Sequence, residues 1–192
     1  MLKRSCVIII VLLVLSACAM KSAHAPQSSA QATTQPRQTT QQTTSARQHI
    51  EAGEYQKAID DYRSEYAKQP QDQVLVKEYV KGLEDIKAAA DGALKKEDYA
   101  SAGKTYKVLQ KNYPEFKGFS TMLSFDKTYL NVKLALCKDA LSKKGFQEYR
   151  QGNLGEAISL WQGYLVIDPT NADIKKALNT AKIQQKNLQQ TK

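Results

Sequence analysis

The chain has 192 residues, and 42% of them are apolar, so it is long enough to hold one domain of ordinary size. Its 28 Lys and Arg residues outnumber its 19 Asp and Glu residues and give a formal net charge of +9 at pH 7. This excess is moderate, and we expect no nucleic-acid partner.

The N-terminus has the layout of an export signal. Two cations, Lys3 and Arg4, precede an unbroken apolar run of ten residues from 6 to 15, and small residues then lead to Cys18. A helix that crosses a membrane needs about 20 residues, so this run is too short for a permanent span. An ordinary secretory signal with an incidental cysteine is the alternative interpretation.

Residues 15–18, with the sequence Leu-Ser-Ala-Cys, resemble the lipobox of bacterial lipoproteins. The resemblance implies that residues 1–17 are a signal peptide and that Cys18, once acylated, begins the mature chain. It also implies a diacylglycerol and an amide-linked acyl chain, and two or more chains anchor a protein stably. Residue 19 is Ala rather than Asp, which in a Gram-negative source implies the periplasmic face of the outer membrane. The sequence leaves the envelope type open.

Residues 18–44 are predicted to form a lipidated, disordered tether. Of the 26 residues from 19 to 44, six are Gln and six are Thr, and Met20 is the only large apolar side chain. Such a composition buries too little surface to offset the entropy of ordering. A binding role for the Gln and Thr tract is the alternative.

The cysteines do not form a disulfide framework in this interpretation. Cys6 leaves with the signal and Cys18 is acylated, so Cys137 has no partner. Because Cys137 lies in an apolar, helix-like stretch, we expect a buried thiol that acts as a small hydrophobic side chain.

Three segments beyond residue 44 share one template. A turn residue (Tyr55, Tyr99 or Leu154) is followed by a small residue three positions later, a large aromatic seven later and a proline fifteen later. The small residue allows a neighbouring helix to approach, the aromatic fills the space beside it, and the proline ends the helix. The nine signature residues are Ala58, Tyr62, Pro70, Ala102, Tyr106, Pro114, Ala157, Trp161 and Pro169.

This template resembles the tetratricopeptide repeat (TPR), in which stacked helical hairpins form a solenoid. The resemblance implies an all-α, TPR-like domain over residues 45–188, with Ala46, Ala90 and Gly145 as the small residues of the first helices. The signature prolines lie 44 and then 55 residues apart rather than 34, so units two and three carry extra length. We therefore expect elongated first helices in those two units.

The remaining elements are expected in chain order. A short helix around 45–52 begins the domain, and a long apolar pattern from residue 73 gives the first helix of unit two. Either Thr170 or Asn171 can cap a final helix, and residues 189–192 form a tail. The apolar face of that final helix is predicted to hold Ile174, Leu178, Ala181 and Leu188.

An irregular stretch before the third unit collects Phe116, Phe119, Met122 and Phe125. These side chains could fold back and fill a gap between helices, or form an exposed patch that docks a partner. Both interpretations are open from the sequence.

No catalytic constellation is evident. Gly103-Lys104-Thr105 matches the end of a phosphate loop, but Asp98 stands where the first glycine is required, so we expect no nucleotide. His24 and His49 have no ligand-like spacing with Cys137, so we expect no metal and no cofactor beyond the lipid. An enzyme is not expected.

The TPR resemblance also implies a concave groove lined by the first helices. The groove positions map onto Arg47, Ile50, Glu51, Lys87, Asp91, Leu94, Lys95, Phe146, Tyr149 and Arg150. Mixed charges around a few apolar side chains suit an extended peptide or a partner helix.

Two functions remain in play. The first is a noncatalytic interaction scaffold or assembly factor of the cell envelope. The second is a module that binds an anionic envelope polymer, peptidoglycan or lipopolysaccharide, because residues 104–150 carry ten basic and four acidic side chains. The sequence names no partner and no oligomeric state.

Overall fold

The computed structural model describes residues 39–190. The predicted signal peptide, Cys18, most of the predicted tether and the last two residues of the predicted tail lie outside that range. Within the described part of the chain, no helix is both long and apolar enough to cross a membrane.

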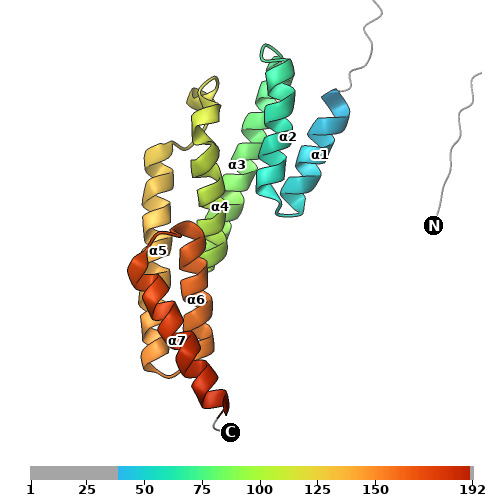
Figure 1. Cartoon of the computed structure of the whole chain (residues 1–192). Helices are drawn as coiled ribbons and strands as arrows, with labels where there is room; N and C mark the ends of the chain where they lie inside the picture. The colour runs from blue at the N-terminus through green and yellow to red at the C-terminus, as the bar shows by residue number, and fades with distance from the viewer. Residues whose placement is uncertain (1–38, 191–192) are drawn as a thin grey trace, which may run out of the picture. The chain divides into compact units, whose positions relative to one another are not determined.

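The described residues form an all-α domain in which helices pack in chain order as successive hairpins (Figure 1). α1 pairs with α2, α3 with α4 and α5 with α6, and α7 packs against α6. The elements are α1 (Thr39–Glu51), α2 (Tyr55–Lys68), α3 (Gln73–Lys95), α4 (Tyr99–Asn112), the 3-10 turns η1 (Tyr113–Phe116) and η2 (Ser120–Met122), α5 (Lys127–Arg150), α6 (Leu154–Ile167) and α7 (Ala172–Gln190).

The three hairpin turns share one backbone geometry. Gly53, Glu97 and Gly152 occupy the same place in their turns, and each has a positive φ, of 72°, 60° and 83°. The amide of the next residue then donates to a carbonyl five positions back, as a helix C-terminal motif with a left-handed residue requires. These bonds are Glu54 to His49 at 2.8 Å, Asp98 to Ala93 at 3.0 Å and Asn153 to Glu148 at 2.9 Å.

The signature residues pack as the template predicts. Ala58, Ala102 and Ala157 are fully buried, and the aromatic residues that follow them, Tyr62, Tyr106 and Trp161, are at most 1% exposed. α2, α4 and α6 each end two residues before their proline. Ala46, Ala90 and Gly145 in the first helices are buried as well.

Two helices are elongated, as expected. α3 has 23 residues and α5 has 24, against 14 in each of α2, α4 and α6. α1 is a correction: it begins at Thr39, so residues 39–44 are helical rather than part of the tether. Ala46 and Ile50 pack against the core, and a packed segment can extend cooperatively into polar residues before it.

The phenylalanine cluster is a packed part of the core. Phe116, Phe119 and Phe125 are at most 4% exposed, so a docking patch made of these rings is wrong. The Phe119 ring lies 5.0 Å from the Tyr79 ring and 5.4 Å from the Tyr66 ring, measured between centroids. Met122 does not join them and is 47% exposed.

The final helix confirms most of its predicted features. Asn171 is the cap, because its Oδ1 accepts from the Ile174 amide at 2.9 Å. Ile174 and Ala181 are buried, but the prediction for Leu188 is wrong, since that side chain is 54% exposed. α7 has 19 residues and α6, against which it packs, has only 14. The last turn of α7, which carries Leu188, therefore extends beyond the end of α6.

Candidate functional site

The residues predicted to line a groove fall into three sets, on α1, α3 and α5. The first set, Arg47, Ile50 and Glu51, lines a small depression against α3. Arg47 forms an ion pair with Glu78 at its edge, and this pairing raises the pKa of the Arg47 guanidinium. None of the other seven predicted residues lines this depression.

The second set centres on Asp91, which joins α3, α4 and α5. Its Oδ1 accepts hydrogen bonds from the hydroxyls of Tyr106 and Tyr129, both at 2.5 Å. Its Oδ2 accepts from Lys87 Nζ at 2.9 Å. The Lys87 ammonium also lies 5.1 Å from the centroid of the Tyr129 ring. Lys87 and Asp91 are thus held by interhelical contacts.

The charge on Asp91 is stabilised within this network. Burial alone raises the pKa of the Asp91 carboxyl, but the hydrogen bonds from Tyr106, Tyr129 and Lys87 outweigh it, so the pKa is lowered. The hydrogen bond to Asp91 in turn raises the pKa of Lys87. Of the other predicted residues on α3, Leu94 is half-buried against the core and Lys95 is exposed.

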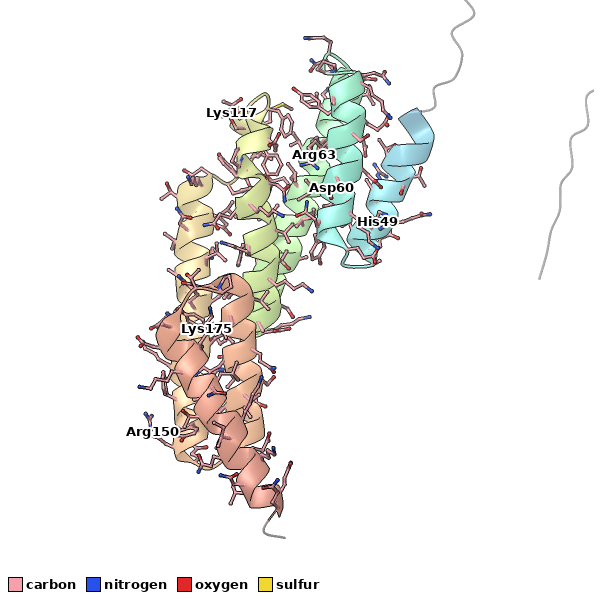
Figure 2. All side chains as sticks on the ribbon, in the orientation of Figure 1. His49, Asp60, Arg63, Lys117, Arg150 and Lys175 are labelled. Atoms are coloured by element: carbon pink, nitrogen blue, oxygen red, sulfur yellow. The ribbon has the colours of Figure 1, made fainter. Side chains whose placement is uncertain are left out.

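The third set lies at the far end of α5. The Phe146 and Tyr149 rings pack on the indole of Trp161, with centroids 5.0 Å and 5.7 Å away. Arg150 is exposed near the α5–α6 turn, as Figure 2 shows. Asp91 contacts Tyr129 near the start of α5, and Phe146 lies about 25 Å farther along that helix, so Asp91 does not reach the third set.

Two clefts that the sequence did not predict lie at the hairpin turns. Each elongated hairpin extends past the turn of the hairpin before it, which leaves a step between them (Figure 1). The first cleft is a space of about 520 Å³ between the α1–α2 turn, α3 and α4. The second cleft, of about 480 Å³, lies between the α3–α4 turn, α5 and α6.

The two clefts are related by the repeat. Tyr55 in the first corresponds to Tyr99 in the second, at the offset that separates the first two signature prolines. Ala89 corresponds to Lys144, and Lys104 to Ser159, at the offset that separates the second and third prolines. The equivalence of these positions can be read from the sequence repeats. Whether the side chains there line an open cleft depends on how far each hairpin extends past the one before it.

The charges around the two clefts differ in sign. The first is lined by Lys57, Lys104 and one carboxylate, that of Glu54. The second has one cation, Lys144, and its four carboxylates are those of Glu97, Asp98, Glu148 and Glu156. The repeat thus presents the same cleft twice with opposite electrostatic character.

Cys137 and Gly103, the other residues singled out in the sequence, lie in the packed interior. Cys137 is fully buried, and burial raises the pKa of its thiol to about 11. Gly103 lies inside α4, where a Cβ atom would approach the Ile167 side chain to 2.1 Å. Across residues 39–190, no group of three or more His, Cys, Asp or Glu side chains is arranged to hold a metal ion.

Comparison with known proteins gives no relative for this chain. No family model, no curated protein and no solved structure matches it.

Proposed function

We propose that this protein is a lipid-anchored, noncatalytic interaction scaffold of the cell envelope, built on a TPR-like stack of helical hairpins. The observation that carries this proposal is the repeated hairpin. Three turns have a residue with positive φ at the same place, and three second helices bury an alanine and, four residues later, a large aromatic side chain. Stacked hairpins of this kind offer extended surfaces to partner proteins.

The TPR assignment rests on packing as well as on the residue template. The first helices carry a buried small residue, Ala46, Ala90 or Gly145, where the family has one. The departures from the family are the spacing of the prolines and the length of α3 and α5. We interpret the domain as a TPR-like stack whose second and third hairpins are lengthened.

The anchor rests on the lipobox-like residues 15–18. Acylation of Cys18 would attach the domain to a membrane through residues rich in Gln and Thr, with Ala19 favouring the outer membrane in a Gram-negative source. The domain would then search for partners within a restricted shell, which raises its effective concentration toward envelope proteins.

The proposal is tested by cross-linking in intact cells, followed by purification of the chain and identification of what accompanies it. We expect an envelope protein to be enriched over a lipid-anchored control protein of unrelated fold. The Cys18→Ala chain should leave the membrane fraction and still bind that partner in solution. If nothing exceeds the control, the scaffold function is wrong.

The basic residues between 104 and 150 support a second candidate function, the binding of an anionic envelope polymer. Of the ten basic side chains between residues 104 and 150, seven form no ion pair with other described residues; the exceptions are Lys138, Lys143 and Lys144. Binding to such a polymer through these charges should weaken steeply between low and high salt. A protein partner held by apolar contacts should be much less sensitive.

A further inference from the structure

We propose that the first cleft binds an acidic peptide segment of a partner protein. An apolar side chain of the segment enters beside Tyr55 and Ala89, and a neighbouring carboxylate pairs with Lys104. This inference rests on the scaffold function proposed above and assigns it a site and a partner chemistry.

The second cleft shows how a lysine can cover the aromatic ring beside a hairpin turn. Lys144 extends from α5 across the α3–α4 turn, where its Nζ donates to Glu97 Oε2 at 2.7 Å. The same ammonium lies 4.9 Å from the centroid of the Tyr99 ring. The aliphatic stem of a lysine covers apolar surface on its way to such a partner. In the second cleft a side chain of the protein itself therefore covers the ring of Tyr99, and about 480 Å³ of space remains beside it.

The first cleft lacks this lysine. Ala89 stands in place of Lys144, and its side chain ends at Cβ, so the ring of Tyr55 has no lysine above it. Ala93 and Val108, which also line the cleft, are partly buried and apolar. A volume of about 520 Å³ lined in this way can accept a large apolar side chain.

The charges of the first cleft select an acidic segment. Glu54 already has partners, because its carboxylate oxygens lie 2.8 Å from Lys57 Nζ and 2.7 Å from His49 Nδ1. Lys104 is exposed and forms no ion pair with any described residue. Gly53 stands where the second cleft has Glu97, so a cation entering the first cleft would find no such carboxylate. A carboxylate near Lys104 is favoured instead.

The experiment uses the detergent-solubilised full chain and a short fluorescein-labelled peptide of alternating Leu and Glu, with binding measured by fluorescence anisotropy. The decisive variant is Ala89→Lys, which places in the first cleft the side chain that its repeat equivalent already has in the second. Its matched control is Ala88→Lys, which adds the same charge at an exposed neighbouring position outside the cleft lining. Circular dichroism checks that both variants stay helical.

We expect the unaltered chain and Ala88→Lys to bind the peptide alike, and Ala89→Lys to bind about tenfold more weakly. Lys104→Glu should also weaken binding, while Lys111→Glu, an equal charge change on the exposed side of α4, should not. A peptide of alternating Ser and Glu should bind poorly because it lacks the apolar side chain. A peptide of alternating Leu and Lys should bind poorly because its charge is wrong.

The proposal would be overturned by no binding of the Leu and Glu peptide, by equal binding by Ala88→Lys and Ala89→Lys, or by equal binding of all peptides. Self-association of the chain that Ala89→Lys abolishes would overturn it too, because the occupant would then be a second copy. Cross-linking of Ala89→Lys in cells separates the two proposals. If the unaltered chain and the Ala89→Lys variant retain the same partner, the scaffold function stands and only the proposal for the first cleft is wrong.

Discussion

At the scale of single residues, Glu97 carries a conformational cost that its repeat equivalents avoid. Among the described residues it is the one non-glycine residue with a positive φ, of 60°, while Gly53 and Gly152 occupy the same place in the other turns. A side chain with a Cβ atom pays about 1 kcal/mol in this region, and glycine does not. Gly53 and Gly152 therefore show which residue type this turn position favours.

We predict that Glu97→Gly is more stable than Glu97→Ala by about 1 kcal/mol. Both substitutions remove the ion pair with Lys144, so the difference isolates the backbone. Urea unfolding followed by circular dichroism measures it. Gly53→Ala should lose a similar amount. Equal stability of the two Glu97 variants would contradict the assignment of strain.

Asp91 gives a prediction that depends on pH. Its carboxyl pKa is lowered in the folded chain, so its stabilising contribution is present above the unfolded pKa of about 3.9 and is lost as pH falls through the folded value. Asp91→Asn should destabilise the domain by about 1–2 kcal/mol at pH 7, because a hydrogen-bonded charge is removed. The gap between variant and parent should narrow as the pH falls below about 3.9.

Unfolding curves of Asp91→Asn and the parent at pH 7 and near pH 3 test this. Asp139→Asn is the control, because that carboxylate lies on the exposed face of α5 and pairs only with Lys143. Asp139→Asn should change the free energy of unfolding by less than about 1 kcal/mol at either pH. A loss for Asp91→Asn that is the same at both pH values would assign its effect to shape rather than charge.

At the scale of helices, the close approach of α5 and α6 depends on Gly145. A Cβ atom there would lie 2.4 Å from Nε1 and 2.7 Å from Cδ1 of Trp161. The indole is itself packed against Phe146 and Tyr149, so it has little freedom to move. The small residue of the first helix is therefore required by the large aromatic of the second.

We predict that Gly145→Ala destabilises the domain by about 2 kcal/mol or more, although alanine favours a helix. The control is Gly92→Ala in the interior of α3, where a new Cβ meets nothing within 4 Å. That substitution should stabilise the domain by up to about 1 kcal/mol. Thermal unfolding of both variants gives the comparison. A neutral Gly145→Ala would mean that the indole can shift.

The connection between α4 and α5 shows how elements far apart in sequence are fastened. Phe116 and Phe119 pack on Tyr79 of α3, with centroids 6.0 Å and 5.0 Å from its ring. The carboxylate of Glu84 accepts from both the amide and the hydroxyl of Ser124 at 2.6 Å. The irregular stretch therefore has fixed contacts with α3.

At the scale of the described domain, α7 closes the stack at its C-terminal end. Ile174 and Ala181 are buried against α6, while residues from 182 onward are mostly exposed. Such an end helix covers apolar surface that a further hairpin would otherwise bury. Its two halves should therefore differ in their effect on stability.

We predict that ending the chain after Asn171 lowers the melting temperature by about 10 °C, because the apolar face of α6 loses its cover. Ending it after Lys182 should change the melting temperature by only a few degrees, about 3 °C at most. Differential scanning calorimetry of the two truncations makes the comparison. Equal losses would mean that the exposed last turns also stabilise the stack.

The sequence determined the local features: where α2, α4 and α6 begin and end, the small and aromatic residues that face each other, and the length of α3. These follow from signals of short range, namely turn residues, prolines and helical periodicity. It placed the start of α1 too late, because the Gln and Thr before Ala46 carry no apolar pattern even though they continue the helix.

Only the tertiary structure decided which surfaces are open. It buried Phe116 and Phe119, tied Lys87 and Asp91 into a network, and left the ring of Tyr55 uncovered beside Ala89, while Lys144 covers the equivalent ring of Tyr99. The physical reason is that exposure depends on how far each hairpin extends past its neighbour and on which helix lies opposite. Neither is encoded within a single helix.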